Sequence, residues 1–233
     1  MSLLKRKKKQ KRSGLGRIAS FDDRSLDYPV RQLLDTTSLV SKTWRRPLAL
    51  DQGNTPQCVG YSLWGAYNTQ PQTRTYSYET RTKYSPTDIY RGAQLLDVWA
   101  GEDYDGSSVL GGVKWMHQMG LIKEYRWCFS LQDVLETLST IGPVVVGTNW
   151  LSEMFDGPDP DPGRKTKARF TLNCSGNNAG GHAYELHGID VEDELVIATN
   201  SWSPEWGDEG RMYLKWADLE RLLDDRGEAL VIL

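Results

Sequence analysis

The order of the expected secondary-structure elements predicts an α+β fold with two lobes. Helical periodicity fills the middle third of the 233-residue chain, and strand-like runs fill the last third. Helices and strands that are separated in this way along a chain pack as separate layers. We therefore expect a mainly helical lobe over about residues 21–129 and a mainly β lobe over about residues 130–233. A cleft between two such lobes is a common place for a functional site.

Four helices are expected before residue 142, because apolar residues recur at helical spacing between turn-forming residues. Pro86 follows Ser85 at the start of the second helix, and Gly120 ends the third. Ser130 caps the fourth, with Asp133 three residues later. The expected spans are 58–70, 86–96, 109–119 and 131–141.

Five strands and one short helix are expected after Gly142-Pro143, and residues 21–57 are expected to be extended chain and loop. Valines fill positions 144–146, and a turn at Glu192-Asp193 predicts a hairpin between two strands. The strands are expected over 143–149, 182–190, 194–200, 211–216 and 228–233, and the helix over 218–223.

The N-terminal residues are strongly basic. Residues 1–17 contain eight basic side chains and no acidic one, namely Lys5, Arg6, Lys7, Lys8, Lys9, Lys11, Arg12 and Arg17. The whole chain has a formal charge of −3, so the remaining residues carry −11. We expect residues 1–20 to be a flexible basic arm. This arm has three interpretations. It could be a solvated tail, a membrane-surface or address signal, or a segment that contacts nucleic acid through residues 5–17, in an unspecific and salt-sensitive way.

The composition excludes several classes of protein. The hydrophobic fraction of 39% and the nine tryptophans indicate a packed core. No run of 18 apolar residues predicts a membrane span, and the residues before the basic run are too few for a signal peptide. Three cysteines without a CxxC motif predict no full disulfide framework, no zinc site and no cofactor. A cytoplasmic or virion-associated location is expected.

Cys58 is the candidate nucleophile. It follows the turn-forming residues 52–56 and lies at the start of an expected helix. A helix N-terminus stabilises negative charge and favours the thiolate. A thiol that transfers acyl groups also needs a general base, a group that orients the base, and an oxyanion donor.

His182 is the candidate base among three histidines. His182 and His187 lie in one expected strand, five positions apart, so their side chains point to opposite faces. Gly180-Gly181 precedes His182 and allows another backbone to approach closely. His117 lies within a helical pattern and is expected to be structural.

Three blocks of sequence resemble papain-like (C1-type) cysteine peptidases. They are Asp51–Cys58 with its six-residue Gln-to-Cys separation, Gly180–Gly188, and Asn200–Gly210 with its Asn-Ser-Trp start. Their order, Cys then His then Asn, matches that family. The resemblance spans about residues 28–233. It implies a helical N-terminal lobe, a β-barrel-like C-terminal lobe, an active site in the cleft between them, and a peptide or protein substrate.

The resemblance also implies a role for each matched residue. Cys58 would be the nucleophile of an endopeptidase, and His182 its base and acid. Asn200 would orient His182, and Trp202 would shield the bond between them from water. Gln52 would donate to the oxyanion together with the backbone N–H of Cys58.

Two further segments fit the resemblance. Gly106, Ser107 and Ser108 resemble the strip that pairs with the substrate backbone. Residues 142–146 resemble the first strand of the barrel-like lobe.

Departures from the family pattern indicate a bacterial or phage-like short form. Thr55 stands where secreted members have a cysteine, and Val59 follows the nucleophile in place of an aromatic residue. The 57 residues before Cys58 leave no room for a full propeptide. Restraint of activity could come from the acidic loop 156–163, the N-terminal arm or a partner. The cleavage preference is left undefined.

Two other functions are alternatives to the peptidase. One is a structural or interaction protein with the same fold, such as a virus or phage particle component that docks through its arm. The other is an amide-transfer enzyme, which Asn200 disfavours because related transfer enzymes more often have Asp as the orienting residue.

Overall fold

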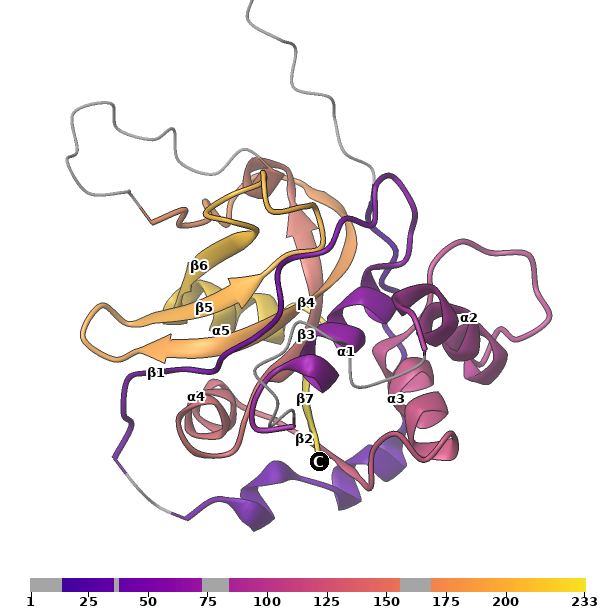
Figure 1. Cartoon of the computed structure of the whole chain (residues 1–233), viewed down its shortest axis with the longest axis horizontal. Helices are drawn as coiled ribbons and strands as arrows, with labels where there is room; N and C mark the ends of the chain where they lie inside the picture. Colours follow the sequence, from indigo (N-terminus) through magenta and orange to yellow (C-terminus); the bar gives the residue numbers. More distant parts are fainter. Residues whose placement is uncertain (1–13, 36–37, 73–83, 156–168) are drawn as a thin grey trace, which may run out of the picture.

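The computed structural model describes residues 14–35, 38–72, 84–155 and 169–233. Within these ranges, five α-helices and seven strands form the chain (Figure 1). The helices are α1 (Cys58–Asn68), α2 (Pro86–Leu96), α3 (Val109–Gln118), α4 (Leu131–Thr140) and α5 (Trp216–Asp224). The strands are β1 (Lys42–Thr43), β2 (Tyr125–Trp127), β3 (Val144–Leu151), β4 (Asn178–Asp190), β5 (Leu195–Thr199), β6 (Arg211–Lys215) and β7 (Glu228–Ile232). Three short 3-10 helices are η1 (Asp23–Asp27), η2 (Val30–Leu33) and η3 (Ser152–Phe155).

The helices begin where their capping residues are. The Ser85 hydroxyl oxygen accepts a hydrogen bond from the Asp88 amide, and the Asp88 carboxylate accepts one from the Ser85 amide, which completes a capping box before α2. Ser130 caps α4 through the amide of Asp133, as the sequence predicted. Ser108 caps α3 in the same way, accepting from the amide of Gly111 at 2.8 Å.

The strands form a seven-stranded antiparallel sheet within the described ranges. Its order is β2-β7-β3-β4-β5-β6, and β1 pairs with β4. β4 begins at Asn178, four residues before the expected start at His182. β1 and β2 were not predicted, since strands of two and three residues are too short to show an alternating pattern.

Alternate residues of the central strands supply two separate cores, one on each face of the sheet. Helices α1, α2 and α3 cover one face, and α4 and α5 pack on the other (Figure 1). The first core contains Val145, Ala183, Leu230 and Ile232 together with α1 to α3. The second contains Val144, Val146, Tyr184, Leu186, Ala229 and Val231 together with α4 and α5.

The α+β fold class with two lobes is therefore confirmed. The expected boundary near residue 129 stays a prediction. The chain does not divide cleanly in space, because Val30 packs in the second core and β2 pairs with the last strand, β7. The junction between α1 and β4 is where the candidate residues meet.

Candidate active site

Cys58 is the first residue of α1, and a tight turn leads into it. The amide and the hydroxyl of Thr55 both donate to the carbonyl oxygen of Gln52, at 3.2 and 2.6 Å. Gly53 within this turn has a φ of +60°, which a glycine adopts without strain. The turn therefore delivers the thiol to the positive end of the helix, where backbone N–H groups lack helical partners.

His182 and Asn200 are joined by a hydrogen bond of 2.9 Å between Nε2 and Oδ1. Asn200 Oδ1 also accepts from the backbone amide of Ser201 at 2.7 Å. An N–H can donate only to the oxygen of a carboxamide, so the Asn200 oxygen faces both groups and His182 Nε2 carries the proton. Nδ1 of the neutral ring is then the atom with a free lone pair. It is buried and has no hydrogen-bond partner among the described residues.

Two tryptophans enclose the His182 ring. Trp202 stacks on it at 4.9 Å between centroids with the planes inclined by 29°, and Trp150 meets it edge-on at 4.8 Å. Both indoles are completely buried. The pair excludes water from the His182–Asn200 bond, which strengthens this polar contact. Trp202 was proposed for this position from the sequence, whereas Trp150 in β3 was not.

Gln52 is tied to the segment that carries Asn200, although 148 residues separate them in sequence. Its backbone amide donates to the carbonyl of Ser201 at 2.8 Å, and its side-chain oxygen accepts from the Ser201 hydroxyl. The oxygen of the carboxamide is thereby fixed, and its NH₂ group points the other way. Sequence reasoning missed this role of Ser201.

The strip Gly106–Ser108 divides into three different roles. Ser107 is completely buried, and its backbone pairs with Gly16 and Ile18. Ser108 turns its side chain into the α3 cap and donates to Asp97. Gly106, with a φ of +102°, donates its amide to the Tyr90 hydroxyl at 3.1 Å. Among the described residues, Ser107 is the one in this strip whose backbone pairs with the backbone of another segment.

That other segment is the end of the expected arm, residues 14–18, which lies across the candidate site. Gln52 Nε2 donates to the carbonyl oxygen of Gly14 at 2.7 Å. The amides of Gly16 and Arg17 donate to the carbonyl of Gly181, at 3.0 and 3.1 Å.

On its other edge the segment runs parallel to the Ser107 strip. The Ile18 amide donates to the carbonyl oxygen of Ser107 at 2.9 Å, and the Ser107 amide donates to the carbonyl oxygen of Gly16 at 2.9 Å. Residues 14–18 are therefore held on one edge by Gly181 and on the other by Ser107, and Cys58 is completely buried.

This placement corrects the expectation of a flexible arm for its last residues. Arg17 is 5% exposed and forms an ion pair, so it is not available to nucleic acid in this conformation. The other basic residues of the arm, 5–12, lie outside the described residues. The close approach of Gly16 to the Pro56 backbone explains a glycine there, because an added Cβ would come within 2.2 Å of the Pro56 oxygen.

Burial controls the charge state of the covered site. It raises the pKa of the Cys58 thiol to about 11, although backbone groups of Ala183, Gly16 and Val59 and the charge of Arg17 act to lower it. Burial likewise lowers the pKa of His182 to about 4, against the effect of the Asn200 hydrogen bond. Both groups are therefore neutral near pH 7 while residues 14–18 are in place. A thiolate at the helix start is therefore disfavoured in this conformation.

A scan against protein-family models and a search of curated protein sequences find no match to this chain. Solved structures do match it. Xylellain, a cysteine protease from Xylella fastidiosa, superposes with a TM-score of 0.73 at 17% identity, covering 97% of both chains. The fold is that of the papain-like cysteine proteases.

Two further papain-like structures align over most of this chain. Digestive procathepsin L2 proteinase from Tenebrio molitor has a TM-score of 0.61 at 16% identity and covers 95% of this chain and 78% of that one. The procathepsin B S9 structure from Trypanosoma congolense has a TM-score of 0.55 at 13% identity, with 94% and 82% coverage. The fold expected from the three sequence blocks is thus confirmed at low sequence identity.

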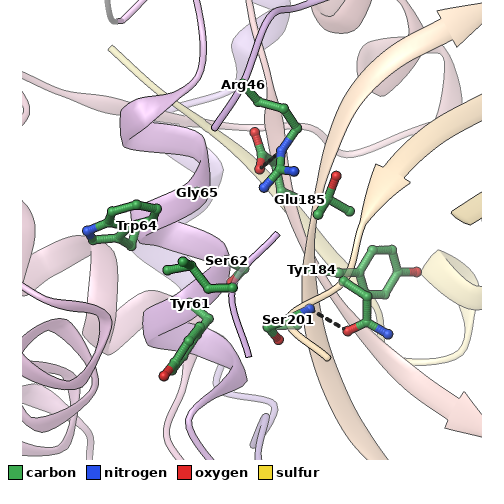
Figure 2. A pocket seen from close by; sticks show the side chains of 12 residues that line it. Arg46, Tyr61, Ser62, Trp64, Gly65, Tyr184, Glu185 and Ser201 are labelled. Atoms are coloured by element: carbon green, nitrogen blue, oxygen red, sulfur yellow. Dashed lines mark hydrogen bonds and ion pairs between the residues drawn. The ribbon is translucent and has the colours of Figure 1, made fainter. Parts of the chain in front are cut away.

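A small pocket lies where α1 meets β4 and β5, next to Asn200 (Figure 2). Its volume of about 20 Å³ is enough for about one water molecule. Arg46 donates to Glu185 at 3.2 Å, and Thr69 donates to the other carboxylate oxygen at 2.5 Å. Glu185 is buried, and burial raises its pKa. These contacts join the helical lobe to the sheet beside the site.

Metal ligands and membrane-spanning helices are not found in the described parts of the chain. No group of three or more His, Cys, Asp or Glu side chains gathers there in a way that could hold a metal. No helix within those ranges has the length and apolar character needed to cross a membrane. Cys58, Cys128 and Cys174 are all free and buried.

Proposed function

We propose that this protein is a cysteine endopeptidase whose nucleophile is Cys58. The observation that carries the proposal is the way the cleft holds residues 14–18. An extended polypeptide lies there with a carbonyl on Gln52 Nε2, amides on the Gly181 carbonyl and backbone pairing to Ser107. The same groups suit the backbone of a peptide or protein substrate.

Hydrolysis would begin when residues 14–18 move aside and a substrate takes their place. His182 Nδ1 takes the Cys58 proton, and Sγ forms a bond to the scissile carbonyl carbon. The carbonyl electron pair moves onto oxygen, which accepts from Gln52 Nε2 and the Cys58 N–H. The C–N bond then breaks as His182 returns the proton to the leaving amine.

The second half of the reaction regenerates the thiol. Water adds to the acyl carbon while His182 takes one of its protons, and the C–S bond breaks to release the carboxylic acid. Asn200 accepts the hydrogen bond from Nε2–H in every step, so that Nδ1 stays turned toward the Cys58 sulfur and the scissile bond.

Residues 14–18 also account for the restraint of activity in this proposal. They lie over a thiol that is completely buried and whose pKa burial raises to about 11. Two of the similar structures are named as procathepsins, which are precursor forms. The acidic loop 156–163, the other candidate for this role within the chain, lies outside the described residues.

The alternative functions gain no specific support from the site. Arg17 is buried against Glu228, so in this conformation it cannot contribute to docking of a particle component through the arm or to nucleic acid contact through residues 5–17. An amide-transfer enzyme remains disfavoured by Asn200 in the orienting position.

An active-site thiol probe and a peptide pool test the proposal together. The full chain should label at Cys58 and cleave peptides, slowly while residues 14–18 are in place, and Cys58→Ala should do neither. Cys128→Ala, which removes another buried thiol, is the matched control and should behave as wild type. Cleavage that persists in Cys58→Ala would contradict the proposal, as would an absence of both labelling and cleavage even after residues 14–18 are displaced.

A further inference from the structure

The side chain of Arg17 leaves the segment in the cleft and enters a buried acidic socket. Its Nε donates to Glu228 Oε1 at 2.8 Å, and its Nη2 donates to the carbonyl oxygen of Arg226 at 2.8 Å. Both side chains of the ion pair are 2% exposed. A guanidinium is thus fully removed from water at this place, where only paired charges are tolerated.

Two glycines, Gly147 and Gly181, leave room for the Arg17 side chain. An added Cβ on Gly147 would come within 2.8 Å of Arg17 Nε, and one on Gly181 would come within 3.3 Å of Arg17 Cδ. Gly147 and Glu228 are direct partners across β3 and β7. The next residue of β3, Thr148, is the partner of His182. The socket therefore lies beside the proposed catalytic histidine on the same sheet.

The Glu228 carboxylate can accept more hydrogen bonds than Arg17 donates to it. Its Oε2 is buried and has no hydrogen-bond partner among the described residues. Burial and the charge of Asp97 act to raise its pKa, and Arg17 acts to lower it. A cation that contacts both carboxylate oxygens would satisfy the group better, which is the geometry that arginine favours.

Other acidic residues line a cavity that Glu228 also lines. This cavity of about 350 Å³ lies between η1, β2 and α5. Asp22, Asp23, Glu220 and Asp224 line the same cavity. Asp22 is already paired with Arg24 and Lys114, and the other three carboxylates add negative charge to the wall of this cavity.

From these contacts we infer that the socket around Glu228 is a specificity pocket that selects an arginine side chain close to the scissile bond of the substrate. Arg17 fills this pocket in the covered form, in the way a substrate arginine would after residues 14–18 leave. This inference rests on the proposed function, because the pocket would select among the peptides that Cys58 then cleaves.

Binding tests the pocket without any chemistry. The full chain carrying Arg17→Ala and Cys58→Ala has a vacated socket and no nucleophile. Fluorescent peptides of the sequence of residues 14–18, with arginine or with the neutral isostere citrulline at the fourth position, are titrated against it. We expect the arginine peptide to bind at least about tenfold more tightly, as a charge-assisted hydrogen bond allows. Adding Glu228→Gln should remove this preference.

Cleavage gives the second readout, in chains that carry Arg17→Ala with Cys58 intact. Peptide pools should be cut with arginine enriched at one position near the scissile bond. Glu228→Gln should reduce the kcat/KM ratio of arginine over norleucine at that position by about tenfold or more. Glu228→Asp keeps the charge and should keep most of the preference. Glu136→Gln, which removes another buried carboxylate paired to an arginine, is the matched control and should leave the ratio unchanged.

The outcomes separate the two proposals. Equal binding of the arginine and citrulline peptides, or an arginine preference that survives in Glu228→Gln chains shown to be folded by thermal unfolding, would overturn the pocket. Selective arginine binding in a chain that neither labels nor cleaves would retain the pocket and overturn the peptidase. Cleavage without arginine enrichment would retain the peptidase and overturn the pocket.

Discussion

The side-chain amide of Gln52 donates a 2.7 Å hydrogen bond to the carbonyl oxygen of Gly14. The group proposed to stabilise the oxyanion thus already holds a carbonyl, and that carbonyl belongs to the same chain. Ser201 fixes the orientation of this amide from the other side, because its hydroxyl donates to Gln52 Oε1. One contact therefore links substrate recognition to the restraint of activity.

Gln52→Ala should separate these two effects. Loss of the bond to Gly14 should loosen residues 14–18 and raise the rate of Cys58 labelling by a thiol probe. Loss of the oxyanion donor should lower kcat for peptide cleavage by about a hundredfold or more. Parallel labelling and turnover assays measure both. If the two rates move in the same direction, Gln52 does not have the double role.

Arg17→Ala should open the site. The substitution leaves Glu228 buried without its cation in the covered form, which destabilises that form relative to the open one. We expect the labelling rate of Cys58 to rise by about tenfold, in line with the loss of a charge-assisted hydrogen bond. Arg24→Ala removes an exposed arginine paired with Asp22 and serves as the control. Equal rates for both variants would contradict the expectation.

Gly16→Ala should open the site by a different route. The new Cβ would lie 2.2 Å from the Pro56 carbonyl oxygen, a distance that two packed backbones cannot relieve without separating. Labelling of Cys58 should therefore rise as it does in Arg17→Ala, while Cys58, His182 and Glu228 are untouched. Limited proteolysis with mass spectrometry should show new cuts near residues 14–18. Unchanged protection of that segment would argue against the packing described above.

Asn200 offers a test of the orienting role. Asn200→Ala should lower kcat by about 10- to 100-fold with little change in KM, because it removes one hydrogen bond to the base rather than a contact to substrate. Asn200→Asp keeps an oxygen for Nε2–H and should retain much more of the rate. A rise in KM alone would assign Asn200 to binding instead.

Glu228 gives the folded chain a distinct pH dependence. Burial raises its pKa to about 7 from an ordinary value of 4.5, so between these values the folded state binds more protons than the unfolded state. The contribution of Glu228 to stability is then fully present below about pH 4.5 and is lost as pH rises through 7. The difference in unfolding free energy, wild type minus Glu228→Gln, should fall by on the order of 1–3 kcal/mol from pH 4.5 to 8.

Urea unfolding at the two pH values measures this difference. Glu220→Gln, at an exposed position of α5, is the control and should show little change between them. A difference for Glu228→Gln that grows with pH would have the wrong sign for a carboxyl whose pKa is raised by burial.

Local patterns in the sequence were enough to place most of the fold. The helices from Cys58, Pro86, Val109 and Leu131 begin where caps and turns predicted them, because a helix start depends on residues within one turn of it. The blocks that contain Gln52, Cys58, His182 and Asn200 could be recognised because each carries its own short motif.

Contacts between distant residues were decided by the tertiary structure alone. The sequence predicted a mobile basic arm over residues 1–20, since eight basic side chains and two glycines carry no periodic pattern. Residues 14–18 nevertheless pair with the backbone of Ser107 and Gly181, and Arg17 pairs with the buried carboxylate of Glu228. The sequence by itself determined which chemical groups were present and in what order. Only the folded chain decided that Arg17 pairs with Glu228 and that the Gly14 carbonyl accepts a hydrogen bond from the Gln52 side chain. Local steric preferences act within a few residues, and burial and pairing act across the whole chain.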